Sequence, residues 1–208
     1  VVAIARVQTG VEAQREINQL FTLEEVRSLL ADSRMADAAC FPGGDGAQAL
    51  GPENDELDGM MAADYFTYLP DDGLVKVDRA TMSASLEGRE PLLDHRLVEH
   101  VARLPSELKI RDGVTKLLLK RIVHRYLPQS MMERPKKGFS VPLGRWLRGA
   151  LRALSEENLE PGRLRQQGLF DPEETQKLLR RVVEGQNENP RKLWTLLMFQ
   201  MWYDRWME

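Results

Sequence analysis

Charged side chains of both signs gather in residues 68–94, which read YLPDDGLVKVDRATMSASLEGREPLLD. Six of these charged residues are our candidates for contact with a polar substrate: Asp72, Lys76, Asp78, Arg79, Glu87 and Arg89. Asp72 and Lys76 have the i,i+4 spacing that places two side chains together on a helix surface. The charge pattern alone favours an exposed helix with internal ion pairs over a binding site.

A second group of cations lies in the turn Arg134-Pro135-Lys136-Lys137-Gly138. Lysine is a compact charge on a long stem, which suits contact with phosphate oxygens without bidentate geometry. A solvated basic loop is the usual alternative for such a run. Proline and glycine at this turn would fix its backbone shape.

Helical periodicity and capping residues account for most of the remaining chain. Helices are predicted to start at Thr22, Asn54, Pro70, Asp94, Thr115, Pro142, Asp171 and Arg191. Thr22 to Glu25 has the capping-box spacing, and Gly185 suits the end of the helix that Asp171 begins. Because no run of buried strands supplies a sheet, the sequence predicts a mainly α-helical chain with a short link at Lys109–Gly113.

Three of these helices carry specific predictions about burial. The helix over residues 115–127 turns Leu118, Leu119, Ile122, Val123 and Tyr126 inward. The helix from Pro142 continues with one apolar face as far as Leu154. Residues 191–207 are apolar almost all round, so we expect burial on several sides and an apolar face that needs a partner.

Residues 40–53 are rich in glycine and are predicted to form a flexible loop. Within the loop, Phe41-Pro-Gly-Gly-Asp-Gly46 could cradle a phosphate only if a strand preceded it and a helix followed it. No apolar strand precedes it, so the surface loop is the better interpretation. We also predict no metal site, because His95 and Glu99 share a helix face without a third ligand at zinc spacing.

Composition describes a folded polypeptide of 208 residues with 42% hydrophobic and 29% charged residues, enough for one domain. One cysteine, no apolar run of membrane-spanning length and no secretory leader predict a cytoplasmic protein. The net charge of −3 hides an acidic segment at 1–95 (7 basic, 18 acidic) and a basic one at 96–152 (14 basic, 4 acidic). The two segments could pair with each other, or the basic one could meet a polyanion.

Residues 74–97, LVKVDRATMSASLEGREPLLDHRL, resemble the C-terminal synthetase domain of glutamine-dependent asparagine synthetases. The motif is carried by Asp78, Arg79, Glu87, Arg89, Pro91, Leu93, Asp94, His95 and Arg96. Residues 133–143 resemble the same family's Arg-x-Lys-x-Gly-Phe segment. The similarity extends from about Leu20 to the C-terminus, and it implies the helical C-terminal portion of an α/β pyrophosphatase-type (adenine nucleotide α-hydrolase-like) domain. Residues 1–208 would thus form a single partial domain.

The resemblance implies ATP-dependent amide formation with Mg²⁺, in which aspartate is adenylated and ammonia from glutamine displaces AMP. Lys136 would contact phosphate during adenylation, and Lys76 and Asp72 would lie near the nucleotide. Asp78, Arg79, Glu87 and Arg89 match the motif without an assigned step, and a buried Glu87–Arg89 network is equally compatible with it. The roles of Gly113 and Lys116, which also resemble a family element, stay open.

The family's phosphate loop, Ser-Gly-Gly-x-Asp-Ser, and its glutaminase half do not occur in these 208 residues. We therefore expect the chain to act only with such segments, in cis or in trans, and to be inactive alone. Homodimerisation is a further expectation; binding to nucleic acid or membrane is not. One alternative is an amidotransferase or β-lactam-synthetase-like enzyme for another carboxylate. The other is a non-catalytic helical binding module.

Overall fold

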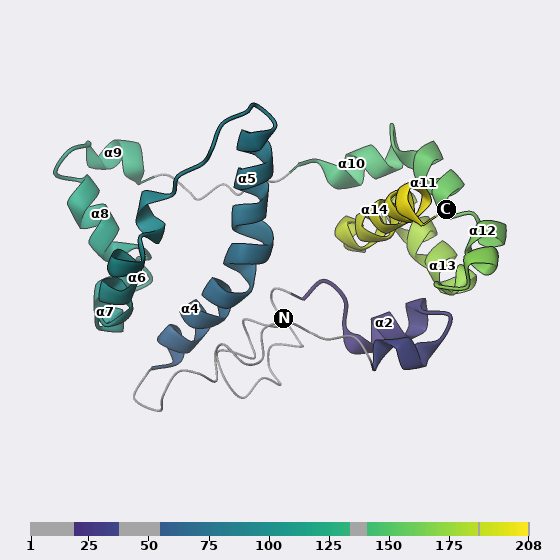
Figure 1. The fold of residues 1–208 in the computed structure, drawn as a ribbon, viewed down its shortest axis with the longest axis horizontal. Coiled ribbons are helices and arrows are strands. Elements are labelled where there is room, and N and C mark those ends of the chain that lie inside the picture. Colours follow the sequence, from purple (N-terminus) through teal and green to yellow (C-terminus); the bar gives the residue numbers. More distant parts are fainter. Residues whose placement is uncertain (1–18, 38–54, 134–140, 187, 208) are drawn as a thin grey trace. The chain divides into compact units, whose positions relative to one another are not determined.

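A computed structural model describes residues 19–37, 55–133, 141–186 and 188–207. Within these ranges the chain is mainly helical, and its only β-structure is two isolated bridges. The described residues fall into two compact units (Figure 1). Unit 1 contains residues 55–133, and unit 2 contains residues 19–37, 141–186 and 188–207. The prediction of a mainly α-helical chain is confirmed, whereas the single partial domain stays a prediction.

Unit 1 is one continuous stretch of the described chain, and it includes residues 68–94, which we call the motif segment. Its elements are α4 (Glu56–Phe66), η3 (Leu69–Leu74), α5 (Val75–Met82), η4 (Pro91–Leu93), α6 (His95–Ala102), α7 (Ser106–Lys109), α8 (Leu117–Val123) and α9 (Gln129–Met132). Helices α4 and α5 follow one another along one nearly continuous helical rod (Figure 1).

Unit 2 joins an early segment to the C-terminal third of the chain. Its elements are α2 (Leu23–Leu29), η2 (Ser33–Ala36), α10 (Leu143–Arg148), α11 (Arg152–Asn158), α12 (Pro161–Gln167), α13 (Pro172–Val183) and α14 (Pro190–Trp206). The end of α2 pairs with the chain before α13, since Ala31 N–H donates to Leu169 O at 3.0 Å and Asp171 N–H donates to Leu29 O at 2.8 Å.

The predicted caps form as expected because each needs only side chains within a few residues. Thr22 and Glu25 complete a reciprocal capping box at the start of α2. Asp171 accepts from the backbone N–H of Glu174 at 2.9 Å at the start of α13. Gly185 follows α13 with a φ of +73°, a left-handed conformation that costs glycine little.

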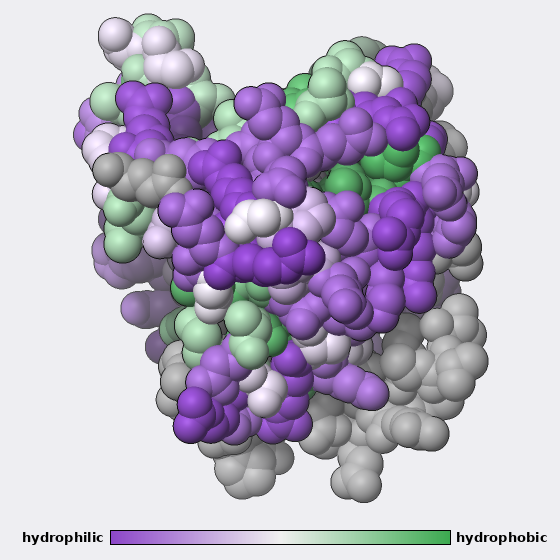
Figure 2. Space-filling view, turned by 90° about the vertical axis from the view of Figure 1, so that its right-hand side faces the viewer, coloured by the Kyte–Doolittle hydropathy of each residue, from purple (hydrophilic) through white to green (hydrophobic). Residues whose placement is uncertain are grey.

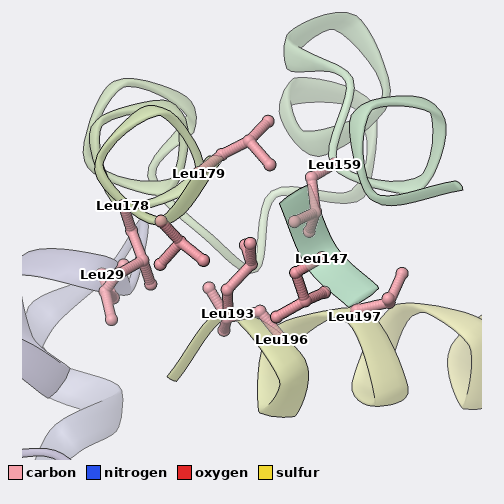
Figure 3. Close-up of a cluster of buried hydrophobic side chains, with 9 residues drawn as sticks. Leu29, Leu147, Leu159, Leu178, Leu179, Leu193, Leu196 and Leu197 are labelled. Carbon is pink, nitrogen blue, oxygen red and sulfur yellow. The ribbon is translucent and has the colours of Figure 1, made fainter. Parts of the chain in front are cut away.

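The hydrophobic core of unit 2 is made of leucines from four helices and one helix end (Figure 3). The labelled side chains are Leu29, Leu147, Leu159, Leu178, Leu179, Leu193, Leu196 and Leu197. Helix α14 packs against α10, α11 and α13. This packing buries Leu193, Leu196, Leu197 and Gln200 in its first three turns, while Arg191 and Thr195 stay exposed.

The last two turns of α14 behave differently from its first three. Met201, Trp202, Trp206 and Met207 are exposed, so the predicted apolar face without a covering partner is present at this end. Hydrophilic residues predominate on the face of the molecule shown in Figure 2, with smaller hydrophobic areas among them. No helix in the described ranges is long and apolar enough to cross a membrane.

In unit 2 one predicted helix length was wrong and one helix was not predicted. The helix from Pro142 ends at Arg148 instead of continuing to Leu154, because Gly149 takes a non-helical conformation (φ −120°, ψ −106°) before α11. Helix α12 was not predicted, although Glu160 caps its start, Pro161 stands at its first position and Gly168 follows its end with a φ of +67°.

In unit 1 the helix predicted over residues 115–127 is shorter, Leu117–Val123, because Lys116 takes a left-handed conformation at its start. Its supposed inward residues Leu119, Ile122 and Tyr126 are exposed. Periodicity identified an apolar face, but the described residues cover it only in part, since Leu118 and Val123 are half-buried.

Candidate functional site

The motif segment begins in a wide helical turn. Residues Leu69–Leu74 form a π-helical turn that leads directly into α5, with Pro70 near its start. The chain therefore stays helical through the point at which Pro70 was expected to begin a new helix. Wide turns of this kind are rare and often occur at functional sites.

Asp72 and Lys76 form the predicted ion pair, with 2.6 Å between Lys76 Nζ and Asp72 Oδ1. The pair bridges η3 and the first turn of α5. The Lys76 side chain is 68% exposed and that of Asp72 is 39% exposed. The ammonium group is therefore held in place on one side and open to solvent on the other.

Helix α5 ends at Met82, whereas the helical spacing predicts an end near Leu86. Leu86 N–H donates to Thr81 O at 3.0 Å and Ser85 N–H donates to Met82 O at 2.9 Å, and Ser85 has a φ of +58°. This is a Schellman motif with serine where glycine is commonest. It reverses the chain, so that a Cβ placed on Gly88 would lie 3.5 Å from Thr81 Oγ1 and 3.7 Å from Val77 Cγ1.

The reversal brings Glu87 and Arg89 beside α5, the helix that carries Asp78 and Arg79. Glu87 and Arg89 pair with each other at 2.9 Å between Oε1 and Nη2, and their side chains are 69% and 83% exposed. The interpretation of this pair as a buried network was therefore wrong. Asp78 and Arg79 are also exposed, and neither side chain forms an ion pair within the part of the chain that the structure describes.

All six candidate residues of this segment are thus accessible on η3, α5 and the return loop. They form a surface rather than an enclosed pocket, and neither of the two described concavities is lined by them. Asp94, which ends the motif, caps α6 through the backbone N–H of Arg96 at 2.9 Å. Its pKa lies below the ordinary range because the Arg96 side chain and this N–H both donate to it.

Two predicted features lie outside the described residues. These are Lys136 with its basic turn, and the glycine-rich loop at 40–53. Gly113 and Lys116 are described. Asp112 and Gly113 form a two-residue turn with φ values of +51° and +76°, closed by Arg111 and Val114. Asp-Gly is a preferred pair for such turns, so the turn predicted at 109–113 is confirmed at Asp112 and Gly113, whereas Lys109 belongs to α7.

One charged contact in unit 1 was not predicted from the sequence. Lys109 Nζ lies 2.5 Å from Asp58 Oδ1, with side-chain exposures of only 8% and 19%. Residues separated by 51 positions leave no local spacing signal. Among the described ion pairs it is the most buried.

Unit 2 carries its own long-range ion pair, between Lys192 on α14 and Glu25 on α2. Burial alone would raise the pKa of Glu25, but hydrogen bonds from Lys192 and Thr22 and the Lys192 charge bring it below its ordinary value. A concavity of about 320 Å³ lies between α12 and α13, and its lining includes Arg165, Glu173, Lys177 and Arg180. None of these residues belongs to the predicted motif.

In the described ranges no group of three or more histidine, cysteine or acidic side chains is arranged to hold a metal ion. The described motif segment therefore presents exposed carboxylates and cations on η3, α5 and the return loop. Such a set can meet a charged substrate, but it does not enclose one.

Comparison with known proteins shows which family the chain belongs to. The family model for asparagine synthase matches residues 4–204. The chain belongs to the asparagine synthase family. A Mycobacterium tuberculosis protein named as a putative glutamine-hydrolyzing asparagine synthetase is 36% identical over 149 residues, 72% of this chain and 23% of that protein. Bacillus subtilis asparagine synthetase (glutamine-hydrolyzing) 1 is 30% identical over 148 residues, 71% of this chain and 23% of its own length.

The chicken asparagine synthetase shares 39% identity over a shorter stretch of 70 residues, 32% of this chain and 12% of that protein. No solved structure matched the chain. The chain thus spans about a quarter of the length of the first two relatives. The resemblance inferred from residues 74–97 and 133–143 is confirmed at the level of the family.

Proposed function

We propose that this chain is the helical C-terminal part of an ATP-dependent carbon–nitrogen ligase that makes asparagine from aspartate, with ammonia taken from glutamine. The observation that carries the proposal is the family match over residues 4–204, which includes both the motif segment and the basic turn. The accessibility of the motif's charged side chains supports it, because groups that meet a substrate must be reachable from solvent, and these remain exposed even where they are paired.

The reaction would proceed in two steps. An oxygen of the aspartate side-chain carboxylate attacks the α-phosphorus of ATP, and the bond from that phosphorus to the pyrophosphate oxygen breaks. Ammonia then attacks the carbonyl carbon of the aspartyl adenylate, the bond to the AMP oxygen breaks, and the nitrogen loses a proton to give the amide. Negative charge gathers on phosphate oxygens in the first step, so nearby cations lower its barrier.

In this proposal Lys136 is the main cation beside the phosphates, and Lys76 is the second. Asp72 holds the Lys76 ammonium through the 2.6 Å contact, which fixes one end of a side chain that would otherwise be mobile. Asp78, Arg79, Glu87 and Arg89 line the adjoining surface and contribute to binding the nucleotide or aspartate.

Mg²⁺ neutralises phosphate charge in reactions of this class and is usually held by phosphates with only one or two carboxylates. Asp72 is engaged with Lys76, and no described cluster supplies three acidic ligands. Phosphate oxygens would therefore supply most of the magnesium ligands, and we assign none to the described residues.

The decisive experiment is aspartate-dependent exchange of labelled pyrophosphate into ATP. An intact protein carrying this chain should catalyse the exchange with aspartate, whereas residues 1–208 alone should not, since they include no Ser-Gly-Gly-x-Asp-Ser loop. Exchange driven only by a different carboxylate would replace asparagine synthesis with the related amidotransferase or β-lactam-synthetase-like activity. Absence of exchange with every carboxylate tested would leave a non-catalytic helical module.

A further inference from the structure

The most buried cation described in the chain lies outside the motif. Lys109 Nζ donates a hydrogen bond to Asp58 Oδ1 at 2.5 Å and a second to the backbone carbonyl of Ala102 at 3.2 Å. Its side chain is 8% exposed. A lysine is seldom buried unless it is paired, and here both contacts are directional.

Of the two partners of Lys109, one precedes the motif segment in the chain and the other follows it. Asp58 is in the first turn of α4, which leads through η3 into α5 with Asp72, Lys76, Asp78 and Arg79. Ala102 is the last residue of α6, which begins directly after Asp94, the last residue of the motif segment. The chain therefore leaves this contact, passes through every candidate residue of the segment, and returns to it.

The ion pairs within the segment hold it only locally, and beyond Lys109 the start of α4 is also linked to α7 through Asp55, which lies against Ser106 and Lys109. The Asp72–Lys76 and Glu87–Arg89 pairs each join residues a few positions apart and are largely exposed. Gly88 packs against α5. No described backbone hydrogen bond joins Gly88 to α6. Exposed pairs of this kind restrain geometry weakly, whereas a buried and doubly bonded ammonium restrains it strongly.

We propose that Lys109 is a positioning residue, which fixes α4–η3–α5 against α6 and α7 and so sets how the charged groups of α5 face those of the return loop. The inference rests on the proposed function, since the geometry it fixes is that of the site for ATP and aspartate. Lys109 is too buried to reach a substrate itself, and its effect on the reaction is exerted through Asp58 and Ala102.

The test separates positioning from stability by means of two variants in an intact protein carrying this chain. Lys109→Met removes the ammonium but leaves the Asp58 carboxylate buried without a partner, so it should lower the melting temperature as well as the exchange rate. Asp58→Asn combined with Lys109→Met also removes that carboxylate charge, so it should recover most of the melting temperature. It cannot restore the bond to Ala102.

We expect the double variant to be folded at 25 °C by circular dichroism, yet to exchange pyrophosphate at least tenfold more slowly than the wild type at saturating ATP. Arg163→Met is the matched control, because it removes a partly buried ion pair with Asp204 inside unit 2. It should lower the melting temperature with kcat unchanged. Wild-type kcat in the double variant would overturn the proposal and leave Lys109 with a structural role only.

If the wild type itself shows no exchange, the proposed function fails independently, and hydrogen–deuterium exchange then decides the positioning role. Amides of residues 69–82 should exchange faster in the double variant than in the wild type, while those of α13 should not change. Equal protection of residues 69–82 in both proteins would overturn the proposal.

Discussion

Replacing Lys76 with methionine separates the local role of this residue from its proposed role toward ATP. Methionine keeps a long unbranched stem and a similar helix propensity, so the main change is loss of the ammonium. The ion pair with Asp72 is of the i,i+4 type, and its lysine is 68% exposed. Pairs of this kind contribute about 0.3–0.5 kcal/mol.

That contribution sets the expected stability change. For a unit of this size about 1 kcal/mol corresponds to roughly 4–8 °C, so Lys76→Met should lower the melting temperature by no more than about 4 °C. If Lys76 contacts a phosphate in the transition state, its loss should slow aspartate-dependent pyrophosphate exchange by about tenfold or more. Both quantities are measured in an intact protein that carries the chain.

Lys177→Met is the matched control for this variant. Lys177 pairs with Glu174 at 2.6 Å, is 48% exposed and lies in unit 2 on α13. It should show an equally small change in melting temperature and wild-type exchange. Equal activity of the Lys76 and Lys177 variants would refute a role of Lys76 in the reaction and leave an ordinary surface ion pair.

Three further outcomes are expected. Lys136→Ala should slow adenylation roughly a hundredfold or more, and Lys137→Ala far less; the reverse order in steady-state kinetics would shift the family motif by one residue. Leu197→Ala, at a side chain that is 0% exposed, should cost about 2–5 kcal/mol in urea unfolding, against less than about 1 kcal/mol for Met201→Ala at 42% exposure. The folded-state pKa of Glu25 is lowered, so the carboxylate stabilises the fold fully above its unfolded pKa of about 4.3. That stabilisation is lost as the pH falls through the folded-state pKa. The difference in free energy of unfolding between wild type and Glu25→Gln should therefore shrink from pH 6 to pH 3.

The sequence by itself determined the parts of this protein that depend on neighbouring residues. The capping box at Thr22, the cap at Asp171 and the Asp72–Lys76 pair each join groups three or four positions apart, so spacing alone predicts them. Family membership was also readable from the sequence, because the motif residues lie close together within residues 74–97. The left-handed Ser85, which ends α5 early, had no such signal because serine is uncommon there.

Only the tertiary structure decided which apolar faces are covered and which distant charges meet. Sequence periodicity places both Leu197 and Ile122 on apolar faces of helices, yet Leu197 is buried in the unit 2 core and Ile122 is exposed. The contact between Lys109 and Asp58 joins positions 51 residues apart, so it arises where the start of α4 meets the end of α7 and from no local pattern. A sequence sets the preferences of short segments, but burial and long-range pairing depend on which segments pack together.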